Sequence, residues 1–432
     1  MAGRPLDAAK GWAARFWDDL KASTDASLLA MLRFVGLLYG RIDTHLPIDQ
    51  AFRKALRHRV SRYAGWRQAF GGITYLLFIM LVVTGVLLSF YYRPSAEEAY
   101  QSIQHIVSGV TMGWLMRDAH VWAANLIVLA ALVHMGRVFF GAAYKPPRET
   151  NWLIGLLLLF VIFAFGATGY LLPWDQWAYW TVTQGLNVLG HTPVVGGTLV
   201  ELLRGDPLVS GATLSRFFAI HVIVLPWLAL GLLVLHFTLV RKHGTAPPPG
   251  APDVGPDDEA GEPFFPNHFL RQLIVGVLVV SLVITAAALY PRDVAAVASP
   301  AQPPDTLYST WIVADVSRGL IYYLGAWGFA GYMLLGALMV LLPLFDRAPE
   351  RRLSKRPIVG SIGVVFFLGF LVAWGAGHHL RSRRISASGE LTPYVQPVAQ
   401  PGPALPSIRP APIPQANPAT ARPDTTRPGG AR

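Results

Sequence analysis

Four histidines in two apolar segments have the spacing of paired metal ligands. His134 follows His120 by 14 residues, and His236 follows His221 by 15. At about 100° and about 1.5 Å per helical residue, either spacing returns the second imidazole to within about 60° of the first, about 21 Å further along the helix. Neutral imidazole is an axial ligand of haem iron. Each segment therefore presents two candidate ligands on one helix face.

The order of the segments sets the levels at which these imidazoles meet. One further apolar segment separates the two, so they run in the same direction, and His120 is expected level with His221 and His134 level with His236. A single histidine in a bilayer is as easily an ordinary polar residue of a bundle. Two matched pairs favour function, because ionisable residues within a membrane are costly and usually have a role. The pattern predicts two bis-histidine haems, one above the other.

Glycines repeat with the same period in two neighbouring segments. Gly71 and Gly85 are 14 residues apart, as are Gly155 and Gly169. A missing side chain at both levels would leave room for a porphyrin edge, although ordinary small-residue helix packing gives the same pattern. Cationic residues near the helix ends could pair with haem propionates or simply anchor the helices at the interface; these are Arg117, Arg137, Arg216 and Arg241.

The elements that must position these residues are membrane-spanning helices. Of the 432 residues, 53% are hydrophobic and 14% are charged, whereas soluble domains carry about 25% charged residues. Charge-free runs long enough to cross a hydrocarbon core of about 30 Å occur at 71–90, 119–136, 151–174, 217–240, 272–291, 319–345 and 357–380. The sequence shows neither internal repeats nor interrupted segments, which argues against a transporter. We predict an all-α integral membrane fold, with a four-helix haem-binding bundle and three further transmembrane helices.

The net charge of +11 indicates topology rather than nucleic-acid binding. Lys and Arg crowd residues 53–67, 137–148, 241–242 and 347–356, which all fall on one side of a regularly weaving chain. Cytoplasmic loops carry such an excess, so we expect a cytoplasmic N terminus. We expect the protein to be located in a bacterial inner membrane. Residues 27–40 are interrupted by Arg33, which predicts a surface amphipathic or buried helix rather than a cleaved signal peptide.

Composition divides the chain into five parts. We predict an N-terminal cytoplasmic extension with an amphipathic helix at 1–66, a dihaem module at 67–244, a Pro- and Gly-rich linker at 245–266 without strand or helix periodicity, a three-helix module at 267–385 and a Pro-rich disordered tail at 386–432. The connection at 175–216 is too long for a tight turn and predicts short helices on the bilayer surface.

Several motifs resemble the cytochrome b family, in particular the chloroplast-type form in which a four-helix cytochrome is encoded separately from a three-helix subunit IV. They are 71–74 (GGIT), 84–85 (TG), 90–94 (FYYRP), 117–120 (RDAH), 134–137 (HMGR), 145–149 (KPPRE), 168–176 (TGYLLPWDQ) and 215–217 (SRF). The histidine spacing of 14 and 15 is also the chloroplast-type pattern. The resemblance runs from about residue 50 to 380 and is most specific in the first four helices.

The resemblance implies the dihaem cytochrome b subunit of a quinol:cytochrome c (or plastocyanin-like acceptor) oxidoreductase in electron transport. Quinol would give one electron to a Rieske iron–sulfur protein and the other to the outer haem, and the inner haem would reduce quinone. Implied partners are the Rieske protein, a c-type cytochrome, quinone, membrane lipid and a second copy of the chain. Tyr170, Trp180, Thr181 and Trp311 would line the outer quinone pocket, and Arg241 the inner one.

Two departures from the family pattern affect the chemistry. Ala69 stands where the chloroplast type has a haem-attaching cysteine, and the chain has no cysteine, so two non-covalent b-type haems are expected and no covalent third one. Thr310 stands where the family's Pro-Glu-Trp-Tyr glutamate takes a proton from quinol. A threonine is no general base near neutral pH. Asp305 or Asp315 could replace it, and we choose Asp315, one to two helical turns further on.

The missing glutamate keeps a second enzyme class open. The alternative is a dihaem membrane anchor that passes electrons between quinone and a peripheral dehydrogenase without splitting the two electrons of quinol. The long 175–216 connection and the additional three-helix module favour the bc-type reading.

Overall fold

The computed structural model describes residues 59–63, 65, 68–190, 192, 194–252, 260–304, 311–380, 384–385 and 391–392. The predicted amphipathic helix within 1–66 lies outside the described residues, and so does the predicted disordered tail except for residues 391–392. So do Asp305 and Thr310. Within the described residues, six helices are long and apolar enough to cross a membrane. The predicted all-α membrane fold is confirmed.

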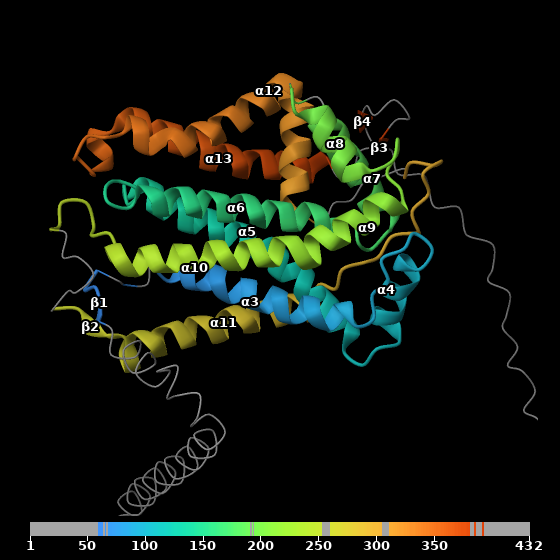
Figure 1. Cartoon of the computed structure of the whole chain (residues 1–432), viewed down its shortest axis with the longest axis horizontal. Coiled ribbons are helices and arrows are strands. Elements are labelled where there is room, and N and C mark those ends of the chain that lie inside the picture. The colour runs from blue at the N-terminus through green and yellow to red at the C-terminus, as the bar shows by residue number, and fades with distance from the viewer. Residues whose placement is uncertain are drawn as a thin grey trace, which may run out of the picture. The chain divides into compact units, whose positions relative to one another are not determined.

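The first set of spanning helices carries the histidines. It comprises α3 (Ala69–Ser89), α5 (Gly113–Phe140), α6 (Glu149–Tyr170), and α9 (Gly211–Ala219), which continues through the π-helical turn η2 (Ile220–Val224) into α10 (Leu225–His243). Helix α3 packs along α5, and α6 packs along α10, as the near-parallel ribbons show (Figure 1). Large apolar side chains point outward, such as Phe160 and Trp227, which are 70% and 72% exposed. Such a surface suits lipid rather than water.

Helix α5 is the most enclosed of the described spans. Of its most apolar stretch 56% is buried, whereas the other spans reach at most 28%. It contacts α3, α6, α11 and α13, so lipid reaches little of its surface. Both His120 and His134 belong to this helix, and each is therefore enclosed by neighbouring helices.

Three further helices pack onto the first set. They are α11 (Phe269–Leu289), which follows η3 (Phe264–His268), then α12 (Ile312–Phe345) and α13 (Pro357–His379). Helices α11 and α13 are among the six helices of membrane-spanning length, whereas the apolar part of α12 is the shorter segment Ala330–Phe345. Helix α11 lies against α3 and α5, whereas α12 and α13 pair with each other and contact α6 and α5 respectively (Figure 1). All described residues belong to one compact unit.

Two interruptions show that the prediction of unbroken segments was wrong. The backbone of α12 leaves helical geometry at Gly325, at φ 67° and ψ −173°, a conformation that glycine adopts without a Cβ clash. The π-helical turn at Ile220–Val224 widens the helix immediately around His221. Neither break involves a charge or a long polar run, so an apolar-run criterion could not detect them.

Short elements fill the connections. Helices α7 (Gln176–Gly190) and α8 (Gly196–Arg204) confirm the short helices predicted for 175–216, whereas α4 (Ala99–Ser108) was not predicted. A one-turn helix, η4, spans Leu353–Lys355. Strand β1 (Arg59–Val60) pairs antiparallel with β2 (Glu262–Pro263), which lies in the predicted linker, and β3 (Arg384–Ile385) pairs with β4 (Leu391–Thr392). Strands of two residues have too little pattern to be recognised in sequence.

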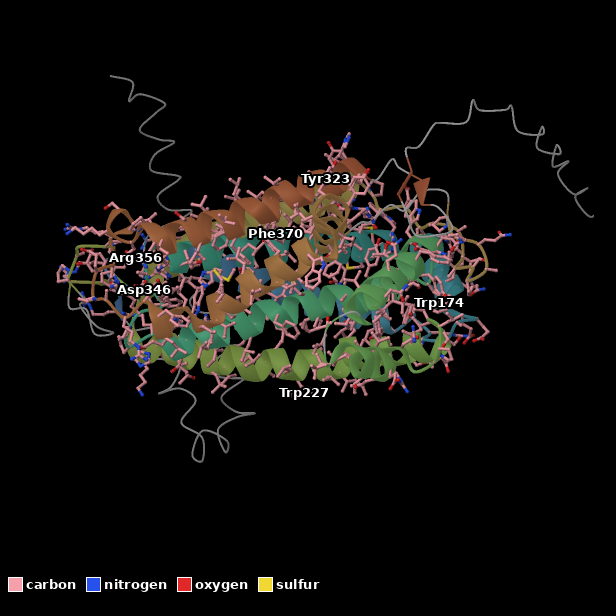
Figure 2. The ribbon with its side chains drawn as sticks, turned by 90° about the horizontal axis from the view of Figure 1, so that it is seen from above. Trp174, Trp227, Tyr323, Asp346, Arg356 and Phe370 are labelled. Atoms are coloured by element: carbon pink, nitrogen blue, oxygen red, sulfur yellow. The ribbon has the colours of Figure 1, made fainter. Side chains whose placement is uncertain are left out.

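The basic loops meet at one end of the bundle. Lys145 Nζ donates to Asp346 Oδ1 over 2.7 Å, which joins the α5–α6 and α12–α13 connections, and Arg148 donates to the His243 carbonyl over 2.9 Å. The α3–α4 and α6–α7 connections meet at the other end, where Tyr92 donates to the Leu172 carbonyl. Figure 2 shows Asp346 and Arg356 at one end and Trp174 at the other. We call these ends inner and outer, following the predicted topology.

Candidate functional site

The four histidines face one another in two pairs. The ring centres of His120 and His221 lie 6.4 Å apart at an interplanar angle of 64°, and those of His134 and His236 lie 6.5 Å apart at 74°. The first pair joins the outer parts of α5 and η2, and the second joins the inner parts of α5 and α10. The structure therefore brings together the partners that the levels predicted, whereas their role as haem ligands stays a prediction.

Both spacings fit one metal ion held between two imidazoles. An imidazole nitrogen binds a metal at about 2.0 Å and lies about 1.1 Å from its ring centre, so two rings on opposite sides have centres about 6.2 Å apart. The observed 6.4 and 6.5 Å match this value. Groups of three or more His, Cys, Asp or Glu that could hold a metal do not occur among the described residues. Haem fits such two-ligand sites, since its porphyrin supplies the remaining ligands.

Each predicted glycine lies against one of these rings. A Cβ added at Gly85 would lie 3.3 Å from His120 Cε1, and one at Gly169 would lie 2.5 Å from His221 Cε1. At the inner level, Gly71 stands against His134 with 3.1 Å and Gly155 against His236 with 3.6 Å. The glycines were predicted to leave room for a porphyrin edge. In the structure they leave room for the imidazoles themselves, which pack directly against the neighbouring helix at the glycine positions.

Two threonines beside these glycines were missed as site residues. Thr84 Oγ1 lies 2.8 Å from His120 Nδ1, and Thr168 Oγ1 lies 3.2 Å from His221 Nδ1. The sequence signal was present, because both occur as Thr-Gly dipeptides at the level of the outer pair. From the sequence alone, these dipeptides indicated only the resemblance to the family and not a contact with the histidines.

The four arginines predicted near haem propionates differ in their surroundings. Arg117 is buried and donates to Asp118 Oδ1 over 2.9 Å and to the Arg292 carbonyl over 2.6 Å. Arg216 donates to the carbonyl of Leu202 over 2.6 Å and so caps the end of α8. Arg241 is exposed at the inner end of α10, and Arg137 is half-buried one turn beyond His134. Contacts of these side chains with propionates stay predictions.

Buried acids hold the connection that leads from α11 towards α12. Asp118 Oδ2 accepts from the Arg292 backbone N–H over 3.2 Å, and Asp175 Oδ2 accepts from that of Ala295 over 3.2 Å. Asp175 Oδ1 also accepts from the Ala178 N–H over 2.8 Å at the start of α7. Burial raises the pKa of Asp175 more than these backbone hydrogen bonds lower it. Sequence reasoning missed both acids, because each lies next to a more conspicuous motif residue.

The predicted outer quinone residues are partly brought together. The rings of Tyr170 and Trp311 stack with centres 6.4 Å apart, and Trp311 lies so close over Gly166 that a Cβ there would be 2.3 Å from the indole. Trp180 Nε1 donates to Gln176 over 3.1 Å. The hydroxyl of Thr181 is buried and has no hydrogen-bond partner among the described residues. An aromatic wall with one unused hydroxyl thus lies near the outer ends of α6 and α7.

Asp315 lies in the first turn of α12 and is completely buried. Its backbone N–H reaches the Trp311 carbonyl over 3.4 Å, so it follows Trp311 by one helical turn. Arg318 Nη1 lies 3.3 Å from Asp315 Oδ1. From the sequence, Asp315 could equally have been an exposed carboxylate at the end of a helix. Its complete burial rules this alternative out.

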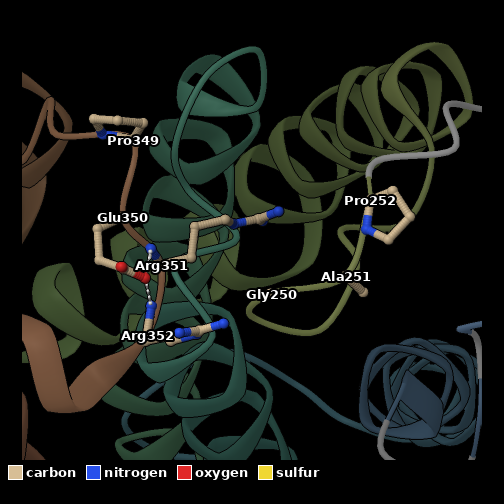
Figure 3. A pocket seen from close by; sticks show the side chains of 7 residues that line it. All are labelled: Gly250, Ala251, Pro252, Pro349, Glu350, Arg351 and Arg352. Atoms are coloured by element: carbon tan, nitrogen blue, oxygen red, sulfur yellow. Dashed lines mark hydrogen bonds between the residues drawn. The ribbon is translucent and has the colours of Figure 1, made fainter.

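A cavity of about 700 Å³ lies between the α10–α11 and α12–α13 connections (Figure 3). Its lining is formed by Gly250, Ala251, Pro252, Pro349, Glu350, Arg351 and Arg352. These lie among the basic inner loops, and none is a predicted site residue. The cavity is therefore separate from both histidine pairs.

Comparisons with known proteins match the part of the chain that carries the four histidines. The family described as "Cytochrome b/b6/petB" matches residues 58–244, the part that contains all four histidines. The cytochrome b6 of Acaryochloris marina (strain MBIC 11017) is 45% identical over 178 residues, which are 41% of this chain and 83% of that protein. The cytochrome b6 of Synechococcus sp. (strain JA-3-3Ab) is 38% identical over 211 residues, 49% of this chain and 98% of that protein.

A solved structure extends the likeness of fold beyond the matched region. A chain of a hyperthermophilic respiratory Complex III superposes with a TM-score of 0.66 at 23% identity, and the match covers 79% of this chain and 98% of that one. At this identity the match shows the fold alone. The helical fold, the histidine pairs within residues 58–244 and the nearly complete cytochrome b6 relatives together show that this chain belongs to the cytochrome b/b6 family.

Proposed function

We propose that the chain is the dihaem cytochrome b subunit of a quinol-oxidising bc-type complex, carrying electrons across the membrane between two quinone sites. The observation that carries the proposal is the pair of facing imidazoles at each of two levels, with ring centres 6.4 and 6.5 Å apart. Bound haem would supply one-electron redox chemistry at each level. His120 and His221 would hold the outer group, and His134 and His236 the inner one.

The surrounding residues of this chain would keep the two sites rigid and dry. The glycines let the imidazoles lie directly against α3 and α6, which limits their rotation. Helix α5 packs against α3, α6, α11 and α13, so these neighbours would limit the access of lipid to its two histidines, which are half-buried. Arg117, Arg137, Arg216 and Arg241 stay candidates for charge pairing with propionates.

At the outer quinone site, Tyr170 and Trp311 would form an aromatic wall, and Asp315 would accept a proton from quinol. A buried carboxylate one turn from Trp311 has the chemistry of the missing family glutamate. Quinol releases protons as it is oxidised, and a charged intermediate without a proton acceptor is costly in an apolar site. Arg318 Nη1 lies 3.3 Å from Asp315 Oδ1 and would hold this carboxylate in position.

The partners follow from the same proposal. The matched solved chain is from a respiratory Complex III, and a complex of that class would require a Rieske iron–sulfur protein, a c-type cytochrome or similar acceptor, and a second copy of this chain. We place the dihaem module at 67–244 and the subunit IV-like module at 267–385, joined by the 245–266 linker. The clustering of basic loops at one end supports an inner-membrane location with a cytoplasmic N terminus.

Counting haem in the purified complex tests the proposal. Pyridine haemochrome should give two b-type haems per chain, and acidified organic solvent should extract both, because the chain has no cysteine for covalent attachment. One haem per chain, or haem that stays on this polypeptide in a denaturing gel, contradicts it. Quinol oxidation that proceeds with a co-purifying dehydrogenase and without any Rieske protein would instead favour the membrane-anchor alternative.

A further inference from the structure

Threonine hydroxyls contact both histidines of the outer pair. Thr84 Oγ1 lies 2.8 Å from His120 Nδ1, and Thr168 Oγ1 lies 3.2 Å from His221 Nδ1. Both threonines are more than nine-tenths buried. They come from different helices, α3 and α6, yet each directly precedes the glycine on which its histidine ring rests. The glycine leaves space for the imidazole ring, and the threonine hydroxyl lies within hydrogen-bond distance of the Nδ1 atom of that ring.

The intrahelical bonds of the two hydroxyls determine which group donates. Thr84 Oγ1 lies 2.7 Å from the Met80 carbonyl, and Thr168 Oγ1 lies 2.7 Å from the Ala164 carbonyl. A carbonyl can only accept, so the single hydroxyl hydrogen is used there and the oxygen is left to accept from the imidazole. Each Nδ1 is then the protonated nitrogen. The lone pair of each ring is on Nε2, the nitrogen needed for a metal bond.

The inner pair has no threonine partner. The residues that precede its glycines are Phe70 and Ile154, which offer no hydroxyl. Among the described residues, no side-chain hydroxyl reaches His134 Nδ1 or His236 Nδ1. The two levels are therefore alike in their glycines and histidines and differ in whether a hydroxyl meets the second imidazole nitrogen.

We propose that Thr84 and Thr168 are positioning residues that fix the tautomer of the outer histidines and lower the reduction potential of the redox group held there. This inference rests on the proposed function. An imidazole whose Nδ1–H donates a hydrogen bond is a more basic ligand, and a more basic ligand favours the oxidised metal. Intrahelical threonine bonds are common in membrane helices, but here the same oxygen atom also meets a histidine in both helices.

The test is a potentiometric titration of the haem absorbance in the complete complex. The variants are Thr84→Val, Thr168→Val and the double variant, with Thr84→Ser and Thr168→Ser as hydroxyl-retaining counterparts. Thr74→Val is the matched control, because Thr74 lies on α3 and bonds the Phe70 carbonyl over 2.9 Å. The outer couple is assigned by its survival in His134→Leu.

The valine variants should raise the potential of the outer couple and leave the inner couple unchanged. A tenfold change in relative affinity for the oxidised and reduced group corresponds to about 59 mV for one electron, and a shift of this order is expected. The serine variants and Thr74→Val should match the wild type. Loss of the outer haem in a valine variant with retention in the serine variant supports the positioning role equally.

Two results would overturn the inference. One is an outer potential in the double valine variant equal to that of the serine variants, with both haems present. The other is an equal shift of both couples, which would reflect a general disturbance. A wild-type complex without two haems would instead contradict the proposed function, so the two failures can be told apart.

Discussion

Gly169 on α6 lies directly against the imidazole of His221 on η2, and a Cβ at this glycine would come within 2.5 Å of Cε1 and 3.0 Å of Nδ1. Real Cβ atoms do not approach so closely, so Gly169→Ala must displace the ring or separate α6 from η2. Overpacking of this kind typically costs about 1–3 kcal/mol. We expect loss of the outer haem from the purified variant, measured as a fall from two haems per chain to one.

Two other glycines provide graded controls for that substitution. A Cβ at Gly155 would lie an ordinary 3.6 Å from His236 Cε1, and nothing lies within 4 Å of a Cβ at Gly231 on α10. Gly155→Ala should therefore keep both haems with at most a small spectral change, and Gly231→Ala should match the wild type. Equal haem loss in Gly169→Ala and Gly231→Ala would show that helix propensity or expression, rather than the ring contact, is responsible.

The two levels should also be separable through the histidines. His134→Leu removes one ligand of the inner pair, while His120 and His221 still face each other across 6.4 Å. The variant should keep one haem per chain with the redox behaviour of the outer couple. His105→Leu, which replaces an exposed histidine on the short helix α4, serves as control and should keep two. Complete loss of haem from stably folded His134→Leu protein would speak against independent sites.

Asp346 joins the inner loops and should contribute strongly to stability. It accepts from Tyr144, from Lys145 over 2.7 Å and from Arg356 over 2.7 Å, and its side chain is 7% exposed. Asp346→Asn leaves two buried cations without their counter-charge, which costs about 3 kcal/mol. The exposed Arg93–Glu98 pair is the control, and Glu98→Gln should cost less than about 1 kcal/mol. Thermal unfolding of both variants in detergent measures the difference.

The same carboxylate predicts a pH dependence of stability. Burial alone would raise the pKa of Asp346, but hydrogen bonds from Lys145, Tyr144 and Arg356 together bring it below its usual value. A lowered folded-state pKa gives stability that is fully present above the unfolded-state pKa and is lost as the pH falls through the folded-state value. The stability difference between wild type and Asp346→Asn should therefore shrink in acid. A difference that stays constant to low pH would contradict the ionised role of Asp346.

Asp315→Asn tests the proton acceptor at the outer site. Because Asp315 is completely buried and one turn from Trp311, its replacement should slow quinol oxidation at least several-fold and alter the pH profile, while both haem spectra stay unchanged. Ser317→Ala, two residues further along α12, is the matched control and should retain wild-type turnover. An unchanged rate and pH profile in Asp315→Asn would remove this residue from the mechanism and favour the dehydrogenase-anchor alternative.

The sequence alone was sufficient to predict the membrane-spanning helices and to predict which histidine pairs with which. Spacings of 14 and 15 residues and the direction of the chain follow from the geometry of a single helix, and they placed His120 beside His221 and His134 beside His236 before any tertiary contact was known. Charge-free length was likewise enough for the six helices of membrane-spanning length that the structure describes. The charge-free length of the segment could not reveal the break at Gly325, because a local change in backbone conformation does not alter the composition of the segment.

Only the tertiary structure decided which side chain meets each glycine, which histidines receive a hydroxyl, and where the buried charges pair. Gly169 and His221 are 52 residues apart, Thr84 and His120 are 36 apart, and Lys145 and Asp346 are 201 apart. Such contacts depend on the rotation and offset of one helix against another, which side-chain packing fixes and a single helix does not encode. For that reason the sequence by itself determined the levels at which the four histidines of this protein pair, whereas the folded bundle decided that the outer pair alone is contacted by threonines.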